Sequence, residues 1–98
     1  MHTQPLISCW HLIWQEPGLE RIQLFQDRIA ITRYTRSGRS ERTLALAEMS
    51  QVGLVKRKSR DGKVRVQVSM KKGWKTILRV PQPNRWQHRI QALLDGHA

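Results

Sequence analysis

The fold is decided by residues 63–96, which read KVRVQVSMKKGWKTILRVPQPNRWQHRIQALLDG. Two runs in this stretch, Val64–Met70 and Trp74–Val80, alternate between apolar and polar residues with the period of two that is typical of strands. The segment Lys71–Gly73 lies between them, and its glycine supplies the positive φ that a tight hairpin usually needs. These residues predict a β-hairpin with one apolar face.

A short amphipathic helix is predicted after this hairpin. Residues 81–83 read PQP, which suits neither a strand nor a helix, and Asn84 with Gln87 three residues later matches a capping box. Apolar residues then recur with helical spacing until Gly96, so we expect them to pack on the apolar face of the strands. The residues of this stripe are Trp86, Ile90 and Leu93.

Five further strands are predicted upstream, joined by short turns. Residues 6–14 are apolar at both odd and even positions, which fits a strand covered on both sides. A short helix is the alternative. Residues 46–52 are interpreted as a helical turn or a bend, and residues 37–40 as a polar loop. Short antiparallel strands at this spacing predict a mainly β, α+β fold, a seven-stranded sandwich or partly open barrel capped by the helix. The five strands are Leu6–Trp14, Leu19–Phe25, Arg28–Arg36, Arg42–Ala47 and Val52–Lys58.

The chain has 98 residues, of which 39% are hydrophobic, and this suits one small hydrophobic core. We expect a flexible N-terminus at residues 1–5 and a single domain over residues 6–95. No run of about eighteen apolar residues is present, and residues 5–14 lack the basic leader and cleavage site of a signal peptide. We therefore expect a cytoplasmic protein, or one that is peripheral on the cytoplasmic face of a membrane.

The positive charge is concentrated in the second half of the chain. The formal net charge is +11, and residues 56–98 carry twelve Lys or Arg against only two acids, Asp61 and Asp95. Such a field attracts acidic proteins and polyanions over a Debye length of about 8 Å at physiological salt. The charge therefore indicates the kind of partner rather than the fold.

Most of these cations lie on or near the tips of two predicted hairpins, which we expect to lie together at one end of the fold. So many cations with so few acids exceed what solubility requires. Trp74 directly follows the hairpin glycine, and it is either an exposed anchor for a partner or part of the core. The candidate partner-binding residues are Lys56, Arg57, Lys58, Arg60, Lys63, Arg65, Lys71, Lys72, Trp74, Lys75 and Arg79.

Residues that could support catalysis or bind a metal are few. Cys9 is the only cysteine, which excludes an internal disulfide, and it shares a strand parity with His11. Two ligands do not make a metal site, so we interpret the pair as a buried thiol beside a histidine. The acids are scattered singly, and no P-loop, nucleophile elbow or dinucleotide-binding glycine pattern is present. We predict a non-enzyme with no cofactor and no small-molecule substrate.

Three features carry a resemblance to a known family: the strand Asp27–Thr32 opened by a turn, the segment Leu44–Val52 leading into the fifth strand, and Trp86 on the C-terminal helix. With the element order, they resemble the pleckstrin-homology-like superfold, bacterial PH-like domains in particular. The resemblance implies this architecture and a habit of docking peptides, proteins or lipid head groups. Lipid-binding members carry Lys and Arg in the first loop between strands, whereas here residues 15–18 read QEPG, so no phosphate-gripping residue carries over.

Three functions fit these observations. The first is an accessory subunit whose basic half docks an acidic protein, such as an acidic electron carrier of the ferredoxin kind, or a larger complex. The second is nucleic-acid binding through phosphate contacts. Against it, the predicted strand faces lack the exposed aromatic pairs that stack bases, since Phe25 and Tyr34 lie apart. The third is peripheral binding to an anionic membrane. We expect the first.

Overall fold

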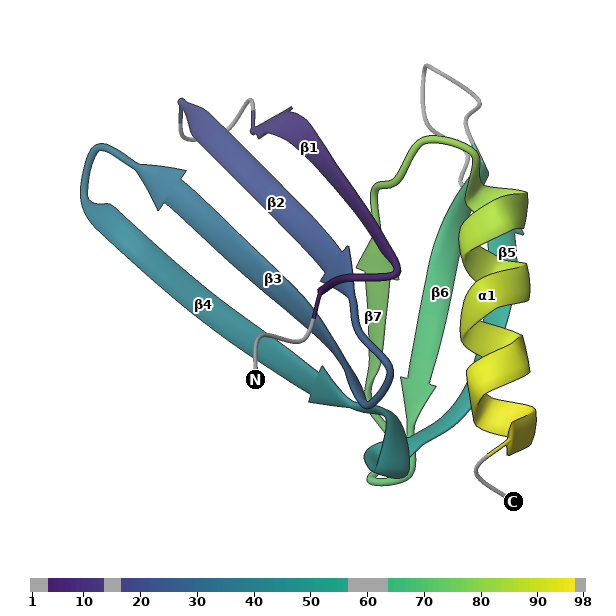
Figure 1. The fold of residues 1–98 in the computed structure, drawn as a ribbon. Helices are drawn as coiled ribbons and strands as arrows, with labels where there is room; N and C mark the ends of the chain where they lie inside the picture. The colour runs from purple at the N-terminus through teal and green to yellow at the C-terminus, as the bar shows by residue number, and fades with distance from the viewer. Residues whose placement is uncertain (1–3, 14–16, 57–63, 97–98) are drawn as a thin grey trace. The chain divides into compact units, whose positions relative to one another are not determined.

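The computed structural model describes residues 4–13, 17–56 and 64–96. Within this part of the chain, seven antiparallel strands form two open sheets, and one helix follows them (Figure 1). The predicted fold class, mainly β with a C-terminal helix, is confirmed. The chain divides into two compact units, an N-terminal unit (Met1–Ala45) and a C-terminal unit (Leu46–Ala98). The single domain over residues 6–95 stays a prediction, and the predicted flexible N-terminus lies mostly outside the described residues.

The N-terminal unit is a four-stranded meander in which each strand pairs with the next one along the chain. The predicted loop at residues 37–40 is wrong in its extent, because the turn occupies only Arg36 and Ser37. Gly38 then starts the last strand with a φ of 126°, which favours glycine. The strands are β1 (Ile7–Ile13), β2 (Gly18–Leu24), β3 (Arg28–Thr35) and β4 (Gly38–Ala45).

The two faces of this sheet differ in burial. On the face away from Ile22 and Leu24, Trp10, Leu12 and Leu19 are 52%, 59% and 42% exposed, although Ala30 and Thr32 on this face are buried. The prediction that residues 6–14 form a strand covered on both sides is therefore wrong for the described strand β1. Side chains alternate along β1, and within the described residues nothing packs closely enough on the face of Trp10 and Leu12 to bury them. The buried apolar residues that pair along the other face are Cys9, Ile22, Leu24, Ile29, Ile31 and Leu44.

The C-terminal unit contains a three-stranded meander and the helix. Only three residues, those of η1 (Leu46–Glu48), form the predicted helical turn, so the next strand begins at Met49 rather than at Val52. The last strand is shorter than predicted, and the middle strand has the predicted bounds. The elements after η1 are β5 (Met49–Lys56), β6 (Val64–Met70), β7 (Lys75–Leu78) and α1 (Pro83–Gly96).

The core of the C-terminal unit combines one sheet face with one helix stripe. Helix α1 lies against β5 and β6 (Figure 1). Its residues Trp86 and Ile90 are 2% and 0% exposed, which confirms them as core residues. The alternation along the strands buries their apolar positions in the same way. The buried strand residues are Met49, Val52, Val66, Val68, Met70 and Leu78.

The helix begins differently from the prediction. Its first residue is Pro83, and the backbone carbonyl of Gln82 accepts hydrogen bonds from the amides of Arg85 and Trp86 at 3.0 and 3.3 Å. Gln82 therefore occupies the capping position, and the predicted capping box at Asn84 is wrong. Proline is favoured at the first helical position because its φ is already suited to the helix and its missing amide would have no partner there.

Two tryptophans of the C-terminal unit provide a matched test of this core. Trp86→Ala should lower the free energy of unfolding by about 3–5 kcal/mol, because it removes a buried aromatic side chain. Trp74→Ala should cost at most about 1 kcal/mol, because Trp74 is 44% exposed. Urea denaturation monitored by circular dichroism measures both. Equal losses for the two variants would contradict the placement of α1.

The turn between β6 and β7 gives a second prediction. Gly73 has a φ of 106°, and a Cβ added there would meet no atom within 4 Å, so only backbone conformation disfavours a side chain. Gly73→Ala should therefore destabilise the protein by about 1–2 kcal/mol. Gly53→Ala is the control, since a Cβ on this strand residue also meets nothing within 4 Å. The two variants should differ in thermal denaturation midpoint, and identical midpoints would argue against this turn geometry.

Candidate docking site

The described cations of the predicted site lie at two opposite ends of the sheet in the C-terminal unit. Lys56 pairs with Val64 at one end of the β5–β6 ladder, and Met49 pairs with Met70 at the other. Successive turns of an antiparallel meander alternate between the two ends of the sheet (Figure 1). A strand of seven residues such as β6 spans about 20 Å. The prediction that both tips lie together at one end is therefore wrong for the described cations, and the tip at residues 57–63 lies outside the described residues. The predicted site divides into two groups of cations.

The first group lies where β5 ends and β6 begins. Lys56 is exposed at the end of β5, Arg65 is half-buried on β6, and Arg79 is exposed just after β7. Leu78 pairs with Val66, so Arg79 follows β7 at this same end. The other predicted members lie outside the described residues: Arg57, Lys58, Arg60 and Lys63.

The second group is the hairpin cluster, defined as Lys71, Lys72, Trp74 and Lys75, all of which are exposed. Of the two predicted alternatives for Trp74, the structure shows the exposed one. A tight turn presents these side chains, because the amide of Gly73 donates to the carbonyl of Met70 at 2.9 Å. The amide of Met70 donates in turn to the carbonyl of Trp74 at 2.9 Å.

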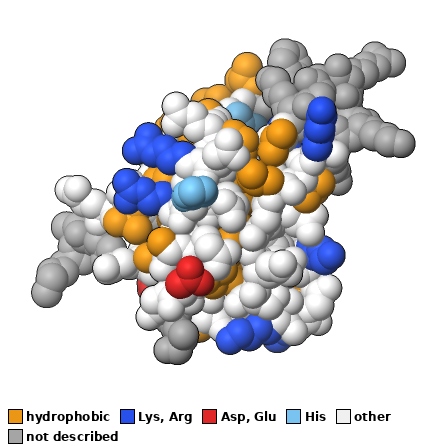
Figure 2. Space-filling view, turned by 90° about the vertical axis from the view of Figure 1, so that its right-hand side faces the viewer, with side chains coloured by type: hydrophobic (Ala, Val, Ile, Leu, Met, Phe, Trp, Pro, Cys, Tyr) orange, Lys and Arg blue, Asp and Glu red, His pale blue; other side chains and the backbone are white. Residues whose placement is uncertain are grey.

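The lysines of the hairpin cluster lie beside Glu48, an exposed acid whose backbone carbonyl accepts a hydrogen bond from the amide of Lys71 at 2.8 Å. Within the described residues, none of Lys71, Lys72 and Lys75 forms an ion pair. The described acids of the C-terminal unit are Glu48 and Asp95, and Asp95 already accepts a hydrogen bond from the amide of the Gln91 side chain at 2.9 Å. The face over α1 and β5 carries its described Lys and Arg side chains in ones and twos rather than in a patch (Figure 2).

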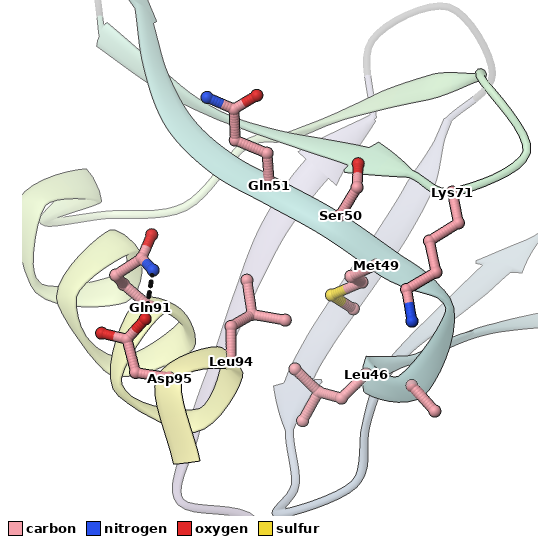
Figure 3. A pocket seen from close by; sticks show the side chains of 9 residues that line it. Leu46, Met49, Ser50, Gln51, Lys71, Gln91, Leu94 and Asp95 are labelled. Atoms are coloured by element: carbon pink, nitrogen blue, oxygen red, sulfur yellow. Dashed lines mark hydrogen bonds between the residues drawn. The ribbon is translucent and has the colours of Figure 1, made fainter. Parts of the chain in front are cut away.

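A pocket adjoins the hairpin cluster through Lys71. Its volume is about 580 Å³, and η1, β5, the β6–β7 turn and the end of α1 line it. Lys71 and Asp95 lie on opposite sides, with apolar side chains between them (Figure 3). The sequence offers no signal for this pocket, because its walls come from segments far apart in the chain. The apolar side chains are those of Leu46, Met49 and Leu94.

The N-terminal unit contains a buried carboxylate with two basic partners. Glu20 is 8% exposed, and its two oxygens lie 3.0 Å from His11 Nε2 and 2.7 Å from Arg33 Nε. Cys9 and His11 share a face of β1, as their parity predicted. Within the described residues, no group of three or more His, Cys, Asp or Glu is placed to hold a metal ion.

The exposed face of the N-terminal sheet carries an aromatic pair that the sequence analysis missed. The rings of Trp10 and Tyr34 stack with centroids 5.8 Å apart and an interplanar angle of 28°. The argument that the strand faces lack such a pair is therefore wrong. The alternation of side chains along each strand places both residues on this face. Their contact also depends on how the strands pair, because Leu19 of β2 lies opposite Leu12 of β1 and Tyr34 of β3.

Comparisons of the chain with protein-family models, curated proteins and solved structures find no match in any of the three. The resemblance to PH-like domains therefore stays a prediction. Within the described residues, no helix combines the length and the apolar character needed to cross a lipid bilayer.

The chemistry of Cys9 gives a prediction for the N-terminal unit. Burial raises the pKa of its thiol, a hydrogen bond with the backbone of Ile22 opposes the rise, and the charge of Glu20 adds to it. The thiol should therefore stay protonated at neutral pH, and iodoacetamide should alkylate the native protein more slowly than the urea-unfolded chain. Mass spectrometry over time measures both rates. Equal rates would contradict the buried position of Cys9.

Proposed function

We propose that this protein is a non-catalytic docking module, an accessory subunit that binds an acidic protein through the hairpin cluster. The observation that carries the proposal is the exposed Trp74 among Lys71, Lys72 and Lys75, none of which forms an ion pair within the described residues. Tryptophan is enriched among the residues that dominate binding energy at protein interfaces. A partner with carboxylates around an apolar recess would complement this arrangement.

Charge complementarity is the reason to expect an acidic partner. The cluster belongs to the half of the chain that holds most of the net charge of +11. Such a field steers an oppositely charged protein during diffusion and raises the association rate, most strongly at low salt. Trp74 would then supply the apolar contact that slows dissociation, because burying a large aromatic side chain removes much apolar surface from water.

The pocket beside the cluster extends the proposed interface. Lys71 at its edge would pair with a carboxylate of the partner, and the half-buried Leu94 would contact an adjoining apolar group. The cations about 20 Å away at the other end of the sheet would serve as a further contact for a large partner.

The proposal is tested with a charge-reversed cluster. A triple variant, Lys71→Glu, Lys72→Glu and Lys75→Glu, is compared with wild type as bait in nuclease-treated lysate of the source organism, and the affinity of the captured protein is then measured. We expect at least a tenfold weaker Kd at about 0.15 M salt, because the variant replaces attraction with repulsion. Trp74→Ala should weaken binding to a similar degree.

The matched control separates position from net charge. Arg36, Arg85 and Arg89 are exposed and lie outside the hairpin cluster, so reversing all three to Glu changes the net charge equally. This control should retain most of the affinity for the same acidic protein. Equal losses in the two triple variants would reject the hairpin cluster as the site. Recovery of nucleic acid or lipid alone would reject docking of an acidic protein.

A further inference from the structure

The exposed face of the N-terminal sheet presents an ordered row of side chains that the proposed function does not use. Trp10 on β1 and Tyr34 on β3 stack with ring centroids 5.8 Å apart, and Trp10 is 52% exposed. The guanidinium carbon of Arg21 lies 5.2 Å from the centre of the Trp10 ring, and that of Arg39 lies 5.8 Å from the centre of the Tyr34 ring. We call these four side chains the aromatic row: Arg21, Trp10, Tyr34 and Arg39.

We infer that the aromatic row binds single-stranded nucleic acid. Bases stack on exposed aromatic rings whatever their sequence, and each stacked base contributes roughly 1–3 kcal/mol. The guanidinium groups of Arg21 and Arg39 flank the ring pair, so they can contact the phosphates that join the stacked bases. RNA-binding modules with four-stranded antiparallel sheets use aromatic side chains on a sheet face in this way.

The chemistry of the face favours nucleic acid over an acidic protein. The carboxylates of an acidic protein would pair with Arg21 and Arg39, but they offer no planar ring to pack on the exposed part of the Trp10 ring. A nucleic acid supplies both planar bases and phosphates, and residues 1–45 carry six Arg against four acids, which adds a modest sequence-independent attraction. The inference is independent of the hairpin cluster, because the aromatic row belongs wholly to the N-terminal unit.

The neighbours of the row indicate which kind of nucleic acid it would bind. Leu12 and Leu19 are 59% and 42% exposed, and they form a cross-strand row with Tyr34. These apolar side chains suit the flat faces of bases and offer no hydrogen bonds to base edges. A duplex hides its base faces inside the stack, so we expect a preference for single strands with little dependence on sequence.

One acid on this face provides a gain-of-affinity test. The carboxylate of Glu41 lies 3.6 Å from the guanidinium of Arg39, and the strand alternation places both residues on the same face of β4. This carboxylate competes with a phosphate for Arg39, and its negative charge repels the phosphate. Glu41→Gln should therefore tighten binding severalfold at low salt, with a smaller gain at high salt.

The experiment measures binding of fluorescein-labelled oligothymidylate and oligouridylate of about twelve nucleotides by fluorescence anisotropy, a length that matches common single-strand sites. Trp10→Ala and Tyr34→Ala should each weaken binding about tenfold, while Trp10→Phe should retain most of the affinity. Arg21→Ala and Arg39→Ala should lower both the affinity and its salt dependence. Trp74→Ala is the matched control, an exposed tryptophan outside the row, and should bind as wild type does.

Several results would overturn the inference. Unchanged affinity in Trp10→Ala and Tyr34→Ala would remove the ring pair from the binding site. Competition by duplex DNA as strong as that by single strands would exclude base stacking. If an alanine variant does not fold, the oligonucleotide is instead crosslinked to the wild-type protein with ultraviolet light. Crosslinks found only at residues other than Trp10 and Tyr34 would overturn the inference. The acidic protein captured by the hairpin cluster should bind Trp10→Ala and wild type equally, which separates the two proposals.

Discussion

The constraint on which the structure depends is the alternation of side chains across paired antiparallel strands. In β6, Val66, Val68 and Met70 are buried, while the residues between them are more exposed. Because the period is two, a shift of the register by one residue would reverse the two faces of the strand. The same rule gives the N-terminal sheet a buried apolar face and an exposed face that carries Trp10.

A second consequence of strand pairing is the distribution of charge. Each turn of a meander lies at the opposite end from the preceding turn, so a cluster that is continuous in sequence becomes divided in space. The hairpin cluster keeps Lys71, Lys72 and Lys75 together because one tight turn carries them. Like charges held this close repel one another, and a surface of this kind is stabilised when an anion binds it.

The two proposed surfaces use aromatic side chains in different surroundings. Trp74 projects from a turn among lysines, and its neighbours are flexible point charges suited to carboxylates. Trp10 lies on a sheet face beside Tyr34, with Arg21 over the Trp10 ring and Arg39 over the Tyr34 ring. Guanidinium groups are planar and weakly hydrated, so they stack on rings and still contact phosphates. The chemistry of each surface therefore follows from which cations accompany the tryptophan.

The sequence by itself determined the order of elements, the bounds of β6 and the burial of Trp86 and Ile90, because strand and helix periodicities are local properties of the chain. It also identified the cations of the hairpin cluster. It located the starts of β4, β5 and α1 less well, since turns and caps depend on backbone hydrogen bonds, such as those accepted by Gln82, that side-chain patterns do not specify.

Only the tertiary structure decided which side chains meet across strands and which remain exposed. The stacking of Trp10 on Tyr34 requires the register of three strands, and the pocket requires the end of α1 to lie near η1. Neither contact is encoded in a local pattern, because each joins residues that are distant in the chain. Exposure of Trp74 was likewise left open by the sequence, since an apolar residue beside a turn can point either way. Tertiary packing decides such cases because it sets how much apolar surface a neighbouring element can remove from water.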